Sequence, residues 1–190
     1  MGMPVANQRY WTVEDVWALP AEPGVRYEAV DGELLVTPAP EFLHQRAVLE
    51  IATTLNQLLR PGGLGEAVIA PSDVLIPPTQ LLQPDVYVIR PLSKVELRLS
   101  ARAMPSPMLA VEVLSPSSAR FDRLTKRVMY QRAGIEYWIV DLDARLVERW
   151  LPDAERPEIC ADVLEWQPAT ASFGLRLDWA ALLARVHGDA

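Results

Sequence analysis

The chain has 190 residues, a formal net charge of −7 and a hydrophobic fraction of 50%, with one cysteine and two histidines. This length predicts a single domain over residues 1–190, and the lone cysteine excludes an internal disulfide. A zinc cage of about four thiolate and imidazole ligands is excluded as well, so carboxylates would have to hold most of any metal ion. The longest charge-free stretch, residues 74–84, is shorter than the roughly 20 apolar residues of a membrane span. No signal-peptide pattern opens the chain, and we expect a cytoplasmic protein that does not bind a membrane.

Positive charge is concentrated in one part of the chain. Residues 90–132 hold nine basic and three acidic residues, a local charge of +6 that leaves −13 for the rest. A locally basic surface can attract an anionic ligand to an acidic protein, so DNA stays a candidate partner. The alternative is that these basic residues form a solvated helix face and a charged loop.

A short helix and a hairpin are expected first along the chain. Thr12 and Asp15 have the spacing of a helix capping box, which predicts a short helix directly after Thr12. The dipeptide Asp31-Gly32 then separates two apolar segments and suits the left-handed conformations of a two-residue turn. Strands are therefore predicted at residues 25–30 and 33–36.

A long helix follows at residues 41–59, because apolar side chains recur there at every third or fourth position. His44 lies on the apolar face of this helix. The further expected elements are one or two strands at 67–76, a strand at 86–89, a loop or exposed helix at 92–107, a strand at 108–114, a helix at 119–133, a strand hairpin at 137–140 and 145–150, a strand at 159–166 and a helix at 179–186. This order predicts an α/β fold with a mixed central sheet flanked by helices, an N-terminal helix and hairpin, and a C-terminal strand and helix extension.

Glu112 is an ionisable residue inside the otherwise apolar segment 109–114. Side chains along a strand alternate between its two faces, which places Glu112 with Ala110 and Leu114. A buried carboxylate is unfavourable unless it is paired or binds a metal. Glu112 is therefore expected either to form an ion pair with an arginine at the strand end or to bind a metal ion.

Asp85 precedes the strand expected at 86–89 and lies 27 positions before Glu112. Two strands joined by a loop of this length can lie side by side, which would bring both carboxylates to the same edge of the sheet. Paired carboxylates suit Mg²⁺, a hard cation that takes one or two protein carboxylates and keeps several waters. Aspartate next to proline is also common in turns, so Asp85 becomes informative only together with Glu112.

Lys126 is one of only two lysines among 18 basic residues. Helical spacing places Lys126 on one face of the expected helix with Asp122 and Tyr130. A lysine is a compact charge that can position a water or stabilise a phosphate during its reaction. The alternative is a surface ion pair with Asp122, worth about 0.3–0.5 kcal/mol.

These residues belong to a longer pattern in the chain. Its parts are Arg26-Tyr27-Glu28, Asp31-Gly32-Glu33, His44, Pro84-Asp85, Val111-Glu112-Val113-Leu114-Ser115-Pro116-Ser117-Ser118, Asp122, Lys126, Tyr130, Gly134 and Glu136-Tyr137-Trp138-Ile139-Val140-Asp141. The pattern resembles the Uma-type endonucleases, a bacterial family in the PD-(D/E)XK, or restriction-endonuclease-like, superfamily. The resemblance implies a nuclease core at about residues 25–150 and divalent-metal-dependent cleavage of phosphodiester bonds.

The resemblance also implies roles for individual residues. Asp85 and Glu112 match the metal-binding acids, and the backbone carbonyl of Val113 would complete the ligands of Mg²⁺ or Mn²⁺. Leu114 stands where the superfamily usually has its lysine, so Lys126 from the next helix is the candidate for that role.

Other residues would support the site. Glu28, Glu33 and His44 are candidate accessory ligands or water-positioning groups, with a hydrogen-bonded core histidine as the alternative for His44. The residues expected to hold the DNA backbone are Arg120, Arg123 and Arg127.

Three functions remain open at this point. The first is a Mg²⁺-dependent DNA endonuclease, and the second is a nuclease-fold module that binds nucleic acid or a partner protein without cleavage, which Leu114 favours. The third, another hydrolase, is disfavoured because the chain shows neither a phosphate-binding glycine loop nor a serine or cysteine nucleophile with a matching base. Enzymes that cut both strands are often symmetric, so a homodimer or higher oligomer is a further expectation, with an interface that the Trp-bearing strands near Trp138 and Trp150 could supply.

Overall fold

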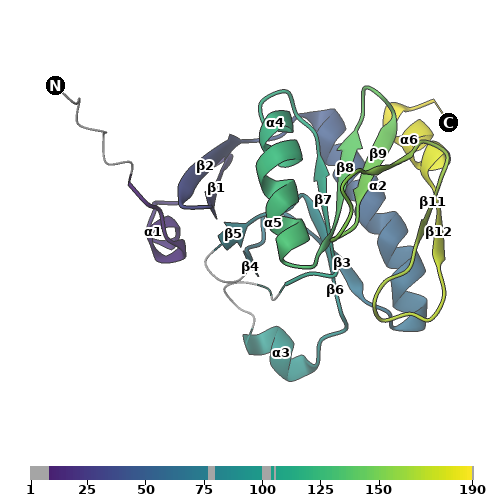
Figure 1. The fold of residues 1–190 in the computed structure, drawn as a ribbon, viewed down its shortest axis with the longest axis horizontal. Helices are drawn as coiled ribbons and strands as arrows, with labels where there is room; N and C mark the ends of the chain where they lie inside the picture. Colours follow the sequence, from purple (N-terminus) through teal and green to yellow (C-terminus); the bar gives the residue numbers. More distant parts are fainter. Residues whose placement is uncertain (1–8, 77–79, 100–103, 105, 190) are drawn as a thin grey trace.

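The computed structural model describes residues 9–76, 80–99, 104 and 106–189. A six-stranded sheet in the order β10-β9-β8-β7-β6-β3 forms its centre (Figure 1). Its strands are β3 (Glu66–Ile69), β6 (Val86–Ile89), β7 (Leu109–Val113), β8 (Glu136–Asp141), β9 (Leu146–Trp150) and β10 (Glu158–Cys160). The pair β7 and β8 is parallel and the other neighbours are antiparallel. The expected mixed central sheet is confirmed.

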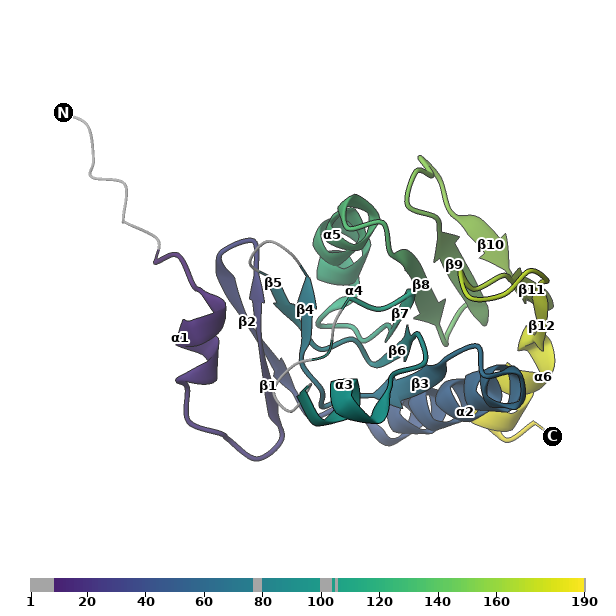
Figure 2. The same cartoon turned by 90° about the horizontal axis from the view of Figure 1, so that it is seen from below.

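Helices cover both faces of this sheet (Figure 2). The helices α2 (Phe42–Leu59) and α6 (Trp179–His187) pack on one face. The other face is covered by α4 (Ala119–Phe121), a π-helical turn η2 (Asp122–Lys126) and α5 (Arg127–Arg132). The alternation predicted for β7 is confirmed, because Val111 packs toward α2 and α6 whereas Ala110 packs with Tyr130 of α5.

The helix α2 buries the apolar face that its sequence period predicts. Ile51 and Leu55 are fully buried against the sheet, and His44 is buried near the first turn. Leu49 on the opposite side of the helix is 60% exposed. The contact between α2 and the sheet therefore depends on one stripe of side chains.

Leu55→Ala is expected to destabilise the protein by about 2–5 kcal/mol, because it leaves a cavity in the core between α2 and the sheet. Leu49→Ala makes the same chemical change on the exposed side of the helix and should cost less than about 0.5 kcal/mol. Urea unfolding of both variants measures the difference. Equal losses of stability would contradict the packing described for α2.

A second, four-stranded sheet lies beside α5 (Figure 2). It is antiparallel in the order β2-β1-β5-β4 and consists of β1 (Val25–Val30), β2 (Glu33–Pro38), β4 (Val74–Ile76) and β5 (Gln80–Leu82). The turn between β1 and β2 has positive φ at both Asp31 (52°) and Gly32 (83°), as the hairpin prediction requires. The helix α1 (Val13–Trp17) has the expected capping box and packs on the outer face of this sheet.

The segment 92–107 contains an exposed helix, α3 (Lys94–Leu99), which is one of the two alternatives expected there. Residues 100–103 and 105, including Arg102 of the basic region, lie outside the described residues. Other elements differ from the sequence-based expectation. The strand expected at 159–166 is two strands, β10 and β11 (Val163–Trp166), and β11 pairs with an unexpected strand, β12 (Leu175–Asp178). The strand β5 was not expected either. Three- and four-residue strands are too short to show a clear period in the sequence.

Two further observations concern surfaces. Trp138 is fully buried and meets Trp166 edge-on at 5.6 Å between ring centroids, so its side chain belongs to the core of the molecule. Trp150 is partly covered by the guanidinium of Arg127. Among the residues that the structure describes, no helix combines the length and apolar character that crossing a bilayer requires.

Candidate active site

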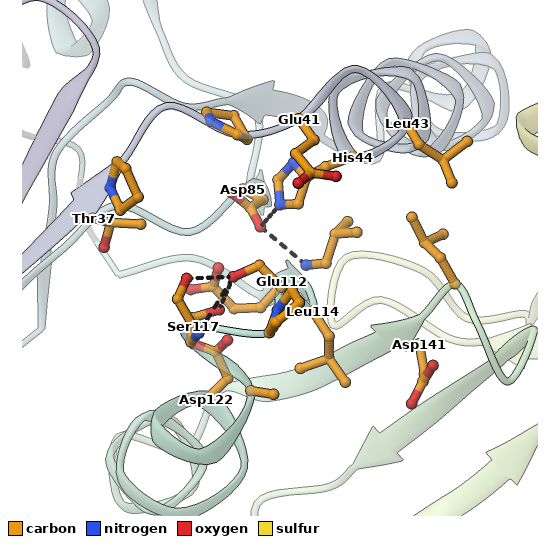
Figure 3. A pocket seen from close by; sticks show the side chains of 18 of the residues that line it. Thr37, Glu41, Leu43, His44, Asp85, Glu112, Leu114, Ser117, Asp122 and Asp141 are labelled. Carbon is orange, nitrogen blue, oxygen red and sulfur yellow. Dashed lines mark hydrogen bonds and ion pairs between the residues drawn. The ribbon is translucent and has the colours of Figure 1, made fainter.

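A pocket of about 690 Å³ opens at the edge of the central sheet where β6 begins and β7 ends (Figure 3). Its walls come from β1, the end of β2, the first turn of α2, the serine-rich segment after β7, the π-helical turn and the loop after β8. In the register of the two antiparallel strands, Val86 lies opposite Val111, which places Asp85 and Glu112 at the same edge. The juxtaposition expected for these two carboxylates is therefore present.

Asp85 accepts three hydrogen bonds from three different elements. One carboxylate oxygen, Oδ1, lies 2.8 Å from Nη1 of Arg26 on β1. The other, Oδ2, lies 3.0 Å from Nε2 of His44 on α2 and accepts a 3.0 Å hydrogen bond from the backbone N–H of Val113. Figure 3 shows the side chains of His44 and Asp85 pointing toward each other. His44 thus contacts the candidate metal-binding acid directly.

These contacts keep Asp85 ionised. Burial by itself raises the pKa of a carboxyl group, but the hydrogen bond and charge of His44, together with Arg26, outweigh it and lower the pKa of Asp85 below its ordinary value. The side chain is only 4% exposed. Asp85 is therefore a permanently charged group on the pocket wall.

Lys126 extends from the helix on one face of the sheet to Glu112 at the end of β7. Its Nζ lies 2.8 Å from Oε1 of Glu112, 3.1 Å from Oε1 of Glu28 and 3.7 Å from Oδ1 of Asp122. Glu28 also accepts a 2.8 Å hydrogen bond from the backbone N–H of Gln83. All four ionisable side chains of this cluster are buried. The contact is a buried network and not the surface pair with Asp122 that was the alternative.

A π-helical turn shapes the helix where it faces the pocket. The N–H of Arg127 donates to the carbonyl of Asp122, five residues earlier, so this turn holds one residue more than an α-helical turn. Both ends of the turn, Asp122 and Lys126, are buried toward the acids, while Leu124 between them is 55% exposed. Such single-turn π-helices occur frequently at functional sites.

The buried charges raise the proton affinity of this cluster. Burial raises the pKa of Glu112 well above its ordinary value, Lys126 partly offsets this, and the nearby carboxylates of Asp85 and Asp122 raise it further. Burial alone would lower the pKa of Lys126, but three carboxylates raise it well above the ordinary value, so the lysine stays charged. Lys126 therefore stays protonated, and the raised pKa of Glu112 favours the protonated form of this carboxyl group as well.

The cluster has more acids than bases. Four buried carboxylates, those of Glu28, Asp85, Glu112 and Asp122, contact two permanent cations within the described ranges, Arg26 and Lys126. Full ionisation would therefore leave two excess negative charges, apart from any charge on His44. A divalent cation at the pocket wall would balance them.

The donor types fit a hard cation such as Mg²⁺ or Mn²⁺ better than zinc, because they are carboxylates and not thiolates. No group of three or more His, Cys, Asp or Glu side chains arranged to hold a metal occurs in the part of the chain that the structure describes. Mg²⁺ usually takes only one or two protein carboxylates and completes its ligands with water and substrate phosphate. Asp85 and Glu112, which both line the pocket, match that requirement.

The other expected site residues are placed differently. Glu33 is exposed at the start of β2, opposite Val30, and does not line the pocket, so the structure gives it no part in the site. Arg120 is exposed next to the pocket. Arg123 lines the pocket but pairs with Asp141 at 3.0 Å and Glu148 at 2.7 Å.

Arg127 does not line the pocket. It stacks on Trp150 with its guanidinium carbon 4.5 Å from the ring centroid, and donates to the carbonyl of Arg123 and to Gln131. Arg127 and Arg123 therefore both have partners within the protein.

The pocket is acidic, although residues 90–132, which contribute part of its lining, carry a net positive charge in the sequence. Its charged lining residues are the acids Glu41, Asp85, Glu112, Asp122, Asp141 and Asp143 and the cations Arg26, Arg123 and Lys126. Folding brings acids from α2 and from the loop after β8 beside the basic helix, which a count along the sequence cannot show. A nucleic acid phosphate would enter this pocket favourably only with additional positive charge.

Two residues of the site had not been assigned a role from the sequence. Arg26 appears in the pattern only as part of Arg26-Tyr27-Glu28, and the structure places it on Asp85. Asp122 was expected to share a helix face with Lys126, and the structure shows that this face is buried in the site. Arg26 and Glu28 are two residues apart on one strand, so their side chains point to the same face. This spacing was the signal that could have placed both side chains at the site.

Comparisons with known proteins show a family and a shared fold. A family model, Uma2, described as “Putative restriction endonuclease”, matches residues 13–180. A crystal structure of a putative nuclease from Anabaena variabilis ATCC 29413 has a TM-score of 0.75 to this chain, with 20% sequence identity over 93% of this chain and 99% of that one. At this identity the match shows a shared fold. No protein with a curated function matches the chain.

Proposed function

Because this chain belongs to the Uma2 family, we propose that it hydrolyses phosphodiester bonds in DNA with Mg²⁺ or Mn²⁺ as its cofactor. One observation carries the proposal. Asp85, Glu112 and Lys126 come from three separate elements and lie together on the wall of one pocket, within a cluster that has excess negative charge. Paired acids and a neighbouring lysine are the groups that phosphodiester hydrolysis at a metal centre needs.

Each residue of the site has a separate role in the proposed hydrolysis. Asp85 and Glu112, with the carbonyl of Val113, would hold the divalent ion, which would lower the pKa of a bound water and offset the charge of the phosphate. Lys126, held 2.8 Å from Glu112, orients the attacking water and stabilises the phosphate as negative charge builds on it. His44 acts as a positioning residue because it fixes the carboxylate of Asp85.

Glu28 supports the lysine. It lies 3.1 Å from Nζ of Lys126 and is fixed by the N–H of Gln83, so it keeps the ammonium group charged and in place. Arg120, exposed at the start of the helix beside the pocket, is the arginine of the expected trio best placed to hold the DNA backbone. Arg123 and Arg127 would first have to leave their partners within the protein.

Conversion of supercoiled plasmid to nicked or linear DNA tests the proposal. We expect cleavage with Mg²⁺ or Mn²⁺ and none with EDTA, and we expect Asp85→Asn and Glu112→Gln to lower the rate by about 10²-fold or more. Glu165→Gln changes an exposed glutamate on β11 in the same chemical way and should cleave like the wild type. Metal-independent cleavage, or equal activity in all three variants, would rule out this site.

A nuclease-fold module without turnover is the second candidate. The carboxylate of Asp85 already accepts hydrogen bonds from Arg26, His44 and the N–H of Val113, and Leu114 stands at the usual lysine position. Such a module would bind DNA with an affinity that falls steeply with salt, would be insensitive to EDTA, and would leave the plasmid intact over long incubation.

A further inference from the structure

Arg26 contacts the acid that the proposed metal site needs. It projects from β1, a strand of the four-stranded sheet, and its Nη1 lies 2.8 Å from Oδ1 of Asp85. The side chain is 18% exposed and lines the same pocket as Glu112 and Lys126. A guanidinium and a divalent cation cannot both bind the same carboxylate oxygen at this distance without repelling each other.

The guanidinium of Arg26 is poorly satisfied where it lies. It makes a single-point contact with Asp85, and its Nε is buried without a hydrogen-bond partner. Arg123, the other arginine in the pocket, in contrast bonds two acids through two different nitrogens. An arginine with five donors and a planar fork usually forms paired bonds when its role is to hold a carboxylate. Arg26 is therefore poised to exchange partners.

We propose that Arg26 is a counter-ion that the divalent cation displaces from Asp85, and that the displaced guanidinium then binds the phosphate of the substrate in the same pocket. This inference rests on the proposed function. When the metal ion neutralises Asp85, the attraction that holds Arg26 there is removed and repulsion replaces it. The nearest anion that enters the pocket is then the DNA phosphate, whose oxygens match the guanidinium fork.

A purely structural role for Arg26 predicts the opposite result for metal binding. If the ion pair only held β1 against β6, its loss would loosen the site and weaken metal affinity. If Arg26 competes with the metal, its removal must strengthen metal affinity. The direction of the change therefore separates the two roles.

Electron paramagnetic resonance of free Mn²⁺ during titration measures this directly without DNA. We expect Arg26→Gln to bind Mn²⁺ about tenfold more tightly than the wild type, and Arg26→Lys, which keeps the charge, to stay close to the wild type. Arg123→Gln is the matched control, because it removes a charge from the same pocket that does not contact Asp85. It should change the affinity far less than Arg26→Gln.

Cleavage at saturating Mn²⁺ tests the second half of the proposal. Arg26→Gln should cleave plasmid about 10²-fold more slowly although it binds the metal more tightly, because one cation on the phosphate is missing. Unchanged cleavage would overturn the phosphate contact. Unchanged or weaker Mn²⁺ affinity in a variant whose thermal unfolding is normal would overturn the competition.

Two results keep failure of this inference distinct from failure of the proposed function. If the wild type binds Mn²⁺ and Glu112→Gln does not, the metal site stands whatever Arg26→Gln shows. If the wild type binds no Mn²⁺ at all, both the metal site and the competition are wrong. If Arg26→Gln does not fold, Arg26→Lys still tests the contact with the phosphate. The lysine is a shorter donor that cannot form paired hydrogen bonds, so cleavage should be slower while the affinity for Mn²⁺ stays close to that of the wild type.

Discussion

Replacing Lys126 with methionine is expected to lower DNA cleavage by about 10²–10³-fold and to destabilise the metal-free protein by about 3–5 kcal/mol. The methionine keeps most of the volume of the lysine stem but removes a charge that lies 2.8 Å from Glu112 and 3.1 Å from Glu28. Because the Lys126 side chain is only 5% exposed, water cannot replace it. Urea unfolding with EDTA measures the stability, and plasmid cleavage with Mg²⁺ measures the activity.

A second substitution separates the electrostatic cause from simple packing damage. Glu112→Gln combined with Lys126→Met removes one of the acids that the lysine neutralises, so the double variant should recover at least about 1 kcal/mol of the lost stability without recovering cleavage. Lys94→Met, at the exposed second lysine of the chain, should change stability by less than about 0.5 kcal/mol. A double variant whose change in stability equals the sum of the two single changes would mean that Lys126 and Glu112 do not act as a pair.

The elements that could be predicted from the sequence are those with local signals. The helix α2 shows its buried face over five turns, and the Asp31-Gly32 turn fixes the hairpin within two residues. The strands β5 and β12 form through partners far away in the chain and have only three and four residues. The π-helical turn Asp122–Lys126 was read as regular helix, because its extra residue leaves no mark on an apolar pattern of this length.

Some residues of the candidate site could also be predicted from the sequence, and others could not. Asp85 and Glu112 could be placed together because each lies at a strand end, and Lys126 was selected through the resemblance to a family. Arg26 contacts an aspartate 59 residues away from a different sheet, and no local pattern reports such a contact. Glu33 was grouped with the site by the same pattern, but the hairpin turn carries it to the solvent.

Net charge along the chain was the least reliable guide to the site. The charge of +6 over residues 90–132 predicted a locally basic surface, whereas the pocket contains more carboxylates than cations. Arg123, in the middle of that region, is neutralised by Asp141 and Glu148 from β8 and β9. The electrostatic field at a site depends on which charges folding brings together. In this pocket the carboxylates outnumber the cations, which favours the binding of a cation.

The excess negative charge of the cluster also predicts that the stability of the protein depends on pH. Without divalent ions, the wild type is expected to lose stability relative to Glu112→Gln as the pH rises above the ordinary glutamate pKa of 4.5. Below this pKa, Glu112 is protonated in both the folded and the unfolded chain, so its ionisation does not change the free energy of unfolding. Above it, the unfolded chain releases the proton while burial keeps the pKa of Glu112 raised in the folded protein. Folding then loses up to about 1.4 kcal/mol per pH unit until the pH reaches the raised pKa.

Urea unfolding in EDTA at several values between pH 5 and pH 9 measures this difference. The stability of Glu112→Gln should match that of the wild type most closely at the acid end and exceed it increasingly toward the alkaline end, whereas Glu165→Gln, at an exposed site, should follow the wild type throughout. Mg²⁺ should restore the wild type at alkaline pH and leave Glu112→Gln unchanged, because only the ionised carboxylate binds the ion and binding stabilises the folded state. Parallel curves for the wild type and Glu112→Gln would show that Glu112 is ionised without penalty, and the excess charge would then no longer argue for a metal ion.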